Sequence, residues 1–325
     1  MLGESTLTHS RMACFKSCPK KHNLAYNLGI RRHRDQAYFR MGGNFHEGLD
    51  LRAQGVPMPE VVEAIRQNYA NVTPWFSDDD SNEWCLECEK VCRLLYGYDW
   101  RWGDDGIEVI ATEQTFTLPI RNPETGSPST VFNVSGKIDK IVKLADGRLA
   151  VMEHKTTGDP IESPEADYWK RCRIDHQVTQ YFWAAQQLGH DVQTIIYDVT
   201  HKPTIRPKLI KGVRETIEQY GDRLTQNIGE RPGFYFQRQE VPRLQSDVDE
   251  FLVELWQQQK AIRQSQLNGW HFRNTSACAM FGRCEYLDIC HGAGDFTDGI
   301  PAGFVQLENI HPELEIAHDD IESPA

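Results

Sequence analysis

The sequence has no apolar run near the length of about 20 residues that a transmembrane helix needs. The segment from Met1 to Pro19 also lacks the apolar core of a signal peptide. These two absences predict a cytoplasmic protein with no membrane contact. The Gly-Lys-Ser/Thr loop of Walker type is missing too, which excludes a nucleotide-driven motor of that class.

Positive charge is scarce, with 35 Lys and Arg against 47 Asp and Glu, and the net charge is −12. This balance does not indicate a nucleic-acid binder, but it does not exclude one, because phosphate contact depends on local fields. Hydrophobic residues at 39% and charged residues at 25% are typical of a folded globular protein. The length of 325 residues predicts one elaborated domain or two closely packed ones.

Nine cysteines are present, and in a chain without an export signal they favour metal ligation or free thiols over disulfides. Cys278, Cys284 and Cys290 recur with five residues between neighbours, and Cys18 lies far away in a Cys-Pro-Lys-Lys segment. Four thiolates suffice for a cubane iron–sulfur cluster or a tetrahedral zinc. Structural zinc sites usually have gaps of about two to four residues, so this spacing favours iron–sulfur. Three buried thiols in a short helical segment are the alternative.

The other cysteines give weaker signals. Cys85, Cys88 and Cys92 are three and four residues apart, so they share one helical face, and core packing is the favoured interpretation because no fourth ligand is near. Cys14 lies one helical turn before Cys18 and is an alternative ligand, although the Cys-Pro context favours Cys18.

Two neighbouring strands are predicted to carry acid groups and a lysine. Alternation predicts strands over 131–142 and 148–155, joined by an Asp-Gly hairpin turn. Glu153 and Lys155 then point to one face, and antiparallel pairing brings Asp139 towards Glu153. Two carboxylates suit Mg²⁺ or Mn²⁺, and the lysine can orient a metal-bound water. An exposed Glu-x-Lys pair, common on strands, is the alternative.

Further polar residues fit the same place. His46 follows a glycine pair on a helix expected to abut the sheet, where a neutral imidazole completes a metal shell; an ordinary surface histidine is the alternative. Gln177 and Tyr181 share a helical face and either hold a phosphate or water near the lysine or cap the sheet. Glu113, on the first predicted strand, is an auxiliary candidate.

The pattern along the chain predicts an α/β core with a helical N-terminal elaboration. Predicted strands lie at 107–118, 131–142, 149–155, 192–200 and 234–241, and predicted helices at 174–188, 213–228 and 246–267. We divide the chain into a helical region at 1–105 with Cys18 and His46, a core at 106–242, a C-terminal helix and cysteine segment at 243–292, and an acidic tail at 293–325.

Taken in order, these motifs resemble the PD-(D/E)xK nuclease superfamily. More narrowly, they resemble its RecB-like exonucleases with an iron–sulfur cluster, such as the CRISPR-associated and helicase-linked members. The resemblance runs from about Ser5 to His291 and rests on the order of the motifs more than on any single one. In much of the family the first gap of the cysteine trio is shorter than it is here. The resemblance implies a restriction-endonuclease-like core, with a mixed sheet flanked by helices and a 4Fe–4S cluster that joins the two ends of the chain.

The resemblance also implies an activity: metal-dependent DNA exonuclease action on ends or single strands, in recombination, repair, replication or CRISPR or phage DNA processing. His46, Asp139 and Glu153 would bind Mg²⁺ or Mn²⁺, Lys155 would position the attacking water, and Gln177 and Tyr181 would position substrate or water. Because no motor loop is present, any unwinding would come from a separate helicase or recombination protein. A non-catalytic iron–sulfur DNA-binding scaffold and a zinc-stapled nuclease of the same fold are the alternatives.

The path of the DNA is predicted from two local features. Arg31, Arg32 and Arg34 belong to the densest basic run and are candidates for phosphate contact, with a solvated loop as the alternative. An aromatic side chain, Tyr168 or Trp169, is a candidate for stacking on a base of a single strand.

Overall fold

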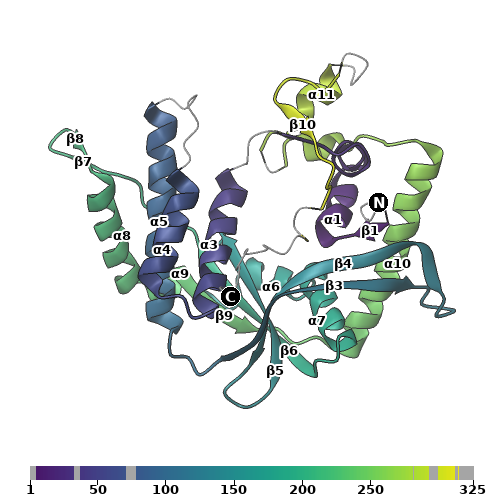
Figure 1. Cartoon of the computed structure of the whole chain (residues 1–325), viewed down its shortest axis with the longest axis horizontal. Helices are drawn as coiled ribbons and strands as arrows, with labels where there is room; N and C mark the ends of the chain where they lie inside the picture. Colours follow the sequence, from purple (N-terminus) through teal and green to yellow (C-terminus); the bar gives the residue numbers. More distant parts are fainter. Residues whose placement is uncertain are drawn as a thin grey trace, which may run out of the picture.

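A computed structural model describes residues 5–32, 37–70, 78–280, 282–292, 299–311 and 314. A sheet forms the base of the molecule, and two groups of helices stand at its two ends (Figure 1). The first group contains α3, α4, α5 and α8, and the second contains α1, α10 and α11. Arg34 and most of the acidic tail lie outside the described residues.

The sheet is mixed, as the sequence predicted. Its order is β1-β4-β5-β6-β9, and β3 also pairs with β4. The chain from β3 to β5 is an antiparallel meander, β5 and β6 are parallel, and β9 returns antiparallel to β6. The bounds are β1 Thr6–Leu7, β3 Glu108–Arg121, β4 Pro128–Lys143, β5 Leu149–Thr157, β6 Val192–His201 and β9 Phe236–Glu240.

The central strand β6 is buried along almost its whole length, as expected for a strand covered on both faces. Helix α7, His176–Gln187, forms the crossover between β5 and β6 and packs on one face of the sheet. It begins where the side chain of Asp175 accepts a hydrogen bond from the backbone N–H of Gln177, and Gly189 follows its end with a φ of +93°. The predicted crossover helix is therefore confirmed.

The helices of the first group surround a second core. Helix α3 approaches α5 closely at Gly48, where a Cβ would lie 2.6 Å from the side chain of Leu95. Cys92 is buried in this core and Cys88 is half-buried, as predicted, whereas Cys85 is exposed and its predicted core position is wrong. The bounds are α3 Ala37–Ala53, α4 Met58–Ala70, α5 Asp78–Trp102 and α8 Ile217–Glu230.

The second group joins the two ends of the described chain. Strand β10 pairs antiparallel with β2, and the hydroxyl of Tyr286 donates to the carbonyl of Ile30 at 2.7 Å. The sequence did not predict β1, β2 or β10. The bounds are α1 His9–Ser17, α2 Pro19–His22, the π-helix η1 Asn23–Asn27, β2 Ile30–Arg32, α10 Gln245–Asn268, the 3-10 helix η2 Thr275–Cys278, α11 Leu287–His291 and β10 Phe304–Gln306.

Helix α8 and several short elements near it or before α7 differ from the predicted pattern. Helix α8 begins at Ile217, later than predicted, because Thr216 and Gln219 form a capping box there. The preceding residues form a small hairpin of β7, Leu209–Ile210, and β8, Val213–Arg214. A short helix, α9 at Pro232–Tyr235, precedes β9, and another, α6, covers Asp167–Cys172.

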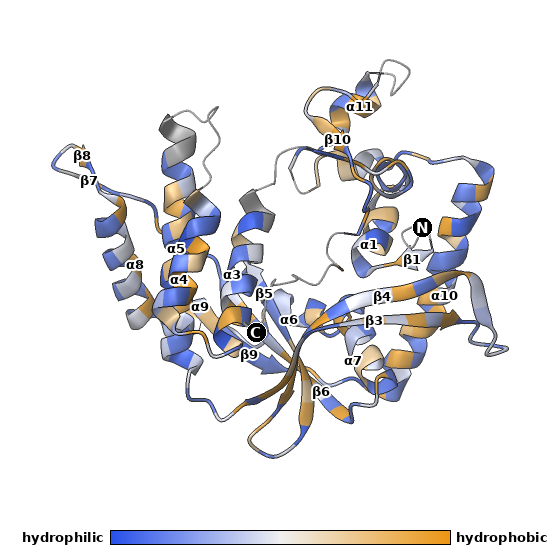
Figure 2. Cartoon of the chain, in the orientation of Figure 1, coloured by the Kyte–Doolittle hydropathy of each residue, from blue (hydrophilic) through white to orange (hydrophobic). Residues whose placement is uncertain are grey.

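The long helices carry both polar and apolar residues (Figure 2). Among the described residues, no helix combines the length and the apolar character that crossing a membrane requires.

Candidate active site

Strands β4 and β5 bring the two predicted carboxylates together. Lys140 pairs with Met152, so the antiparallel register places Asp139 beside Glu153. The carboxylate of Asp139 is held by the next residue of β5: its Oδ2 accepts a hydrogen bond from the backbone N–H of His154 at 3.0 Å. The backbone of the neighbouring strand β5 therefore fixes the position of the Asp139 carboxylate.

Glu153 is 1% exposed, and only one of its two carboxylate oxygens has a partner. Its Oε1 lies 2.6 Å from Nζ of Lys155, while its buried Oε2 has no hydrogen-bond partner among the described residues. Burial raises the pKa of Glu153 to about 8, and the charge of Asp139 adds to the rise. Burial lowers the pKa of Lys155, but the charges of Glu153, Asp175 and Asp139 and the hydrogen bond to Glu153 together outweigh burial, and the net shift is upward. A buried, repelled carboxylate of this kind favours a bound cation.

Helix α3 supplies the histidine at a second wall of the site. His46 Nδ1 lies 3.6 Å from Oδ2 of Asp139. Of the preceding glycines, Gly42 faces β5, where a Cβ would lie 3.3 Å from Oγ1 of Thr156, and Gly43 borders open space. Burial lowers the pKa of His46, with Asp139 opposing the shift, so the imidazole is neutral and able to act as a ligand.

Helix α7 supplies the third wall. Lys155 Nζ donates to Oε1 of Gln177 at 2.6 Å, and Nε2 of Gln177 donates to the hydroxyl of Tyr181 at 3.0 Å. Strand β4, which lies beneath this helix, needs a glycine at position 136. A Cβ on Gly136 would lie 2.7 Å from the side chain of Phe116 and 3.0 Å from that of Tyr181. The chain of hydrogen bonds fixes the lysine ammonium between Glu153 and Gln177.

Two charged residues near this site were not predicted. Asp50 lies one helical turn after His46, and its Oδ1 is 4.0 Å from Nζ of Lys140, which donates to the carbonyl of Leu49 at 3.3 Å. Burial raises the pKa of Asp50 to about 7, and the charge of Glu113 adds to the rise. The spacing of His46 and Asp50, four residues apart on one helix, was the available signal.

Glu113 lies on β3 with a φ of +49° and forms an ion pair with Lys137. Its charge acts on both His46 and Asp50, so the structure places this auxiliary candidate beside the site.

The opposite face of β5 rests on a buried polar network. His154 is 3% exposed, and its Nδ1 lies 3.6 Å from Oδ2 of Asp198. Arg238 Nε donates to the same oxygen at 2.8 Å, and the hydroxyl of Tyr98 also bonds to it. These contacts hold His154 in place, so that its backbone N–H donates the hydrogen bond to Asp139.

Among the described residues, no three histidine, cysteine or carboxylate side chains are arranged to hold an ion as they stand. The donor types nevertheless fit Mg²⁺ or Mn²⁺, because Asp139 lies 3.6 Å from an imidazole nitrogen of His46 and its charge raises the pKa of Glu153, the residue beside it on β5. The buried Oε2 of Glu153, which has no hydrogen-bond partner among the described residues, is an oxygen that a cation at this place would satisfy.

The four predicted cysteine ligands line one cavity of about 860 Å³. Cys18 Sγ accepts a hydrogen bond from the backbone N–H of Asn274 at 3.4 Å. Burial raises the pKa of Cys290, and the charges of Cys284 and Cys18 act in the same direction, so these thiols are neighbours. Cys14 is not part of the lining, and burial raises its pKa to about 12, which disfavours its thiolate.

Arg31 and Arg32, the two described arginines that were predicted to contact DNA, have partners within the protein. The guanidinium of Arg31 lies 4.6 Å from the ring of Tyr26 and donates to a backbone carbonyl. Arg32 lies 5.8 Å from the ring of Phe304.

The base-stacking prediction for Trp169 is wrong, because this residue is 2% exposed and its Nε1 donates to the carbonyl of Ile161 at 3.0 Å. Tyr168 packs its edge against Trp169, with the ring centroids 5.3 Å apart.

The model of the PD-(D/E)XK nuclease superfamily matches residues 6–291 of this chain. A comparison with curated proteins finds no match. The solved structure of SSO0001 is 12% identical over 87% of this chain and 86% of its own, with a TM-score of 0.34. A protein from Eubacterium rectale described as a "putative exonuclease" is 11% identical over 92% of both chains, with a TM-score of 0.46. At these values neither structure adds to what the family match shows.

Proposed function

Because the chain belongs to the PD-(D/E)XK nuclease superfamily, we propose that it is a RecB-like DNA exonuclease that requires Mg²⁺ or Mn²⁺. The observation that carries the proposal is the meeting of Asp139, Glu153 and Lys155, with one buried oxygen of Glu153 left for a cation. The substrate we propose is DNA with an end or a single strand. Since the sequence has no motor loop, a separate helicase or recombination protein is the partner we propose for any unwinding.

In this proposal His46, Asp139 and Glu153 hold the ion, which would polarise the scissile phosphate and lower the pKa of a bound water. The hydrogen bond from the N–H of His154 orients Asp139 for this task. Lys155 is fixed by Glu153 and Gln177, so its charge is directed at the attacking water and the phosphate oxygens as negative charge develops. Tyr181 orients Gln177 in turn.

We further propose a 4Fe–4S cluster on Cys18, Cys278, Cys284 and Cys290. Their presence in the lining of one cavity, which Cys14 does not share, supports this choice of ligands. Such a cluster would join α1 and α2 to the segment that follows α10. The catalytic residues would then belong to the core at 106–242 and the helical region before it, and the cluster to the chain ends.

The direct test uses purified protein and DNA labelled at either the 5′ or the 3′ end, as single strand and as duplex, with and without Mn²⁺. We expect cleavage only with the metal, and release of mononucleotides or short fragments from one labelled end. A closed circular single strand should survive if the enzyme needs an end. Failure to cleave any of these DNAs with Mn²⁺ or Mg²⁺ would refute the nuclease proposal.

We expect Lys155→Ala to lower turnover far more than DNA affinity, because a charge that acts on the transition state contributes little to ground-state binding. The measurement is single-turnover cleavage beside binding of the same DNA without metal. Gln177→Ala is the matched variant: it leaves the ammonium charge but removes one of its two anchors, so its loss of rate should be smaller. Equal losses of binding and turnover in Lys155→Ala would assign this lysine to general phosphate contact.

A further inference from the structure

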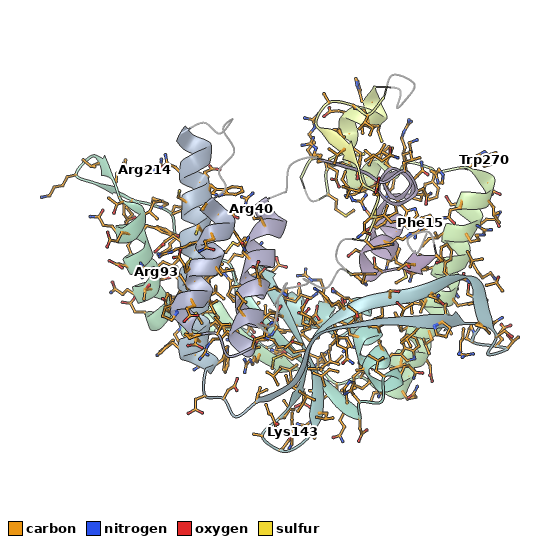
Figure 3. All side chains as sticks on the ribbon, viewed as in Figure 1. Phe15, Arg40, Arg93, Lys143, Arg214 and Trp270 are labelled. Carbon is orange, nitrogen blue, oxygen red and sulfur yellow. The ribbon has the colours of Figure 1, made fainter. Side chains whose placement is uncertain are left out.

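Two large aromatic side chains are exposed immediately after α10. The helix ends at Gly269, which has a φ of +65°, and residues 270–274 form neither helix nor strand. Trp270 is 79% exposed and Phe272 is 71% exposed. His271 between them is half-buried and lines a cavity, so the two aromatic rings are the side chains that face solvent. Figure 3 shows Trp270 at the end of α10 on the outer side of the second helical group.

Positive charge surrounds these rings although the chain as a whole is acidic. The backbone N–H of Lys20 donates to the carbonyl of Phe272 at 3.1 Å, and the charge of Lys20 adds to burial in lowering the pKa of His271. Arg263 and Arg273 are exposed on either side of the segment. Within the described parts of the chain, neither arginine nor Lys20 forms a salt bridge.

A polar cavity of about 580 Å³ lies beside the segment. His271 and Arg263 belong to its lining, together with the buried guanidinium-bearing residue Arg11 and the amides of Asn23, Asn27 and Gln266. The described lining contains hydrogen-bond donors and no carboxylate. This composition favours an anion over a cation or an apolar group.

The segment also leads towards the catalytic strand. Arg273 and Asn274, which follow Phe272, line the cysteine cavity, and so does Thr157 at the end of β5. Thr157 is two residues beyond Lys155 on the same strand. One hollow therefore borders both the end of the aromatic segment and the end of the strand that carries the catalytic lysine.

We propose that Trp270 and Phe272 are a stacking platform for single-stranded nucleic acid, with Lys20, Arg263 and Arg273 along its phosphates. The inference rests on the proposed nuclease function and deepens it, since it names the form of the substrate. Exposed aromatic rings among cations bind a strand whose bases are free to stack on them. Bases within a duplex are already stacked on one another, so the platform selects single strands. The concentration of positive charge favours a nucleic acid over an apolar protein segment.

The test is the fluorescence anisotropy of a 5′-labelled oligothymidylate of about 20 nucleotides without added divalent metal, so that binding is measured without cleavage. We expect Trp270→Ala and Phe272→Ala each to weaken binding about tenfold, and the double variant on the order of 100-fold. Trp100→Ala is the matched control, because Trp100 is also exposed, at 63%, but belongs to α5 in the other helical group. Arg263→Ala should lower the magnitude of the slope of log affinity against log salt by about 0.7, the change expected for one phosphate contact on a single strand.

Two outcomes separate this inference from the nuclease proposal. Unchanged affinity of the double variant for the single strand, with its melting temperature also unchanged, would overturn the platform even if the protein cleaves DNA. Loss of affinity specific to the double variant would support the platform even if the wild type cleaves nothing. An equal loss for a duplex of the same length would also contradict the inference, because a stacking platform does not act on paired bases.

Discussion

Asp139→Ala and Glu153→Ala are each expected to abolish measurable cleavage while the protein stays folded. Asp139 is placed by a backbone hydrogen bond from β5, and one buried oxygen of Glu153 has no hydrogen-bond partner in the described structure. No neighbouring group occupies either position. Loss of one well-placed catalytic group typically lowers the rate by a factor of about 10²–10⁴. The measurement is Mn²⁺-dependent release of label from single-stranded DNA.

The sharper variant of this experiment is Asp139→Asn. An amide oxygen still accepts the hydrogen bond from His154, so the local backbone contact is kept and only the charge is removed. We expect it to be as inactive as Asp139→Ala, whereas Asp167→Asn, on an exposed side chain, should be fully active. Near-normal activity in Asp139→Asn or Glu153→Ala would show that the active site lies elsewhere.

Replacement of Cys18, Cys278, Cys284 or Cys290 by serine is expected to remove both colour and stability. If the four thiolates hold a 4Fe–4S cluster, anaerobically purified protein is brown and contains about four iron and four sulfide per chain. The cluster closes a loop of about 270 residues between Cys18 and Cys290, so its loss restores much freedom to the unfolded chain. Each serine variant should therefore be bleached and melt at a lower temperature.

Cys14→Ser and Cys85→Ser are the controls for this prediction, because neither side chain lines the cysteine cavity. Both variants should keep the colour. Bleaching in Cys14→Ser, with Cys18→Ser still brown, would show that the fourth ligand was wrongly chosen. If the wild-type protein were colourless and contained one tightly bound zinc ion, the four cysteines would form a structural zinc site and the cluster proposal would be wrong.

Local patterns in the sequence predicted the parts of the fold that local forces determine. The Asp-Gly turn and the alternation beside it predicted β4 and β5, and the spacing of Gln177 and Tyr181 predicted their shared face on α7, where they contact one another. Strands β1, β2 and β10 have two or three residues each and exist only because distant segments pair with them. The alternation of polar and apolar residues that identifies a strand cannot be recognised over two or three residues.

The site was predictable to a similar degree. The carboxylates and lysine of β4 and β5 follow from strand geometry, but Asp50 depends on how α3 lies over the sheet. Trp169 has a large aromatic ring with one polar atom, so the sequence was compatible both with an exposed surface for base stacking and with a place in the hydrophobic core. The hydrogen bond from its indole N–H to the carbonyl of Ile161 places it in the core. Cys85 has the helical spacing that would place it on the same face of α5 as Cys88 and Cys92. It lies at the margin of that face, however, and is exposed to solvent.

The pairing of β2 with β10 has a consequence for the order of events during synthesis. All strands of the catalytic sheet have been synthesised once Glu240 has been added, so this sheet can form before β10 is made. Strand β2, in contrast, waits for a partner made more than 270 residues later by sequence position, from Ile30 to Phe304. Until then β2 lacks the strand that pairs with it in the described structure. A ribosome that stops before β10 would thus release a chain with every strand of the catalytic sheet but without the pairing that joins its two ends.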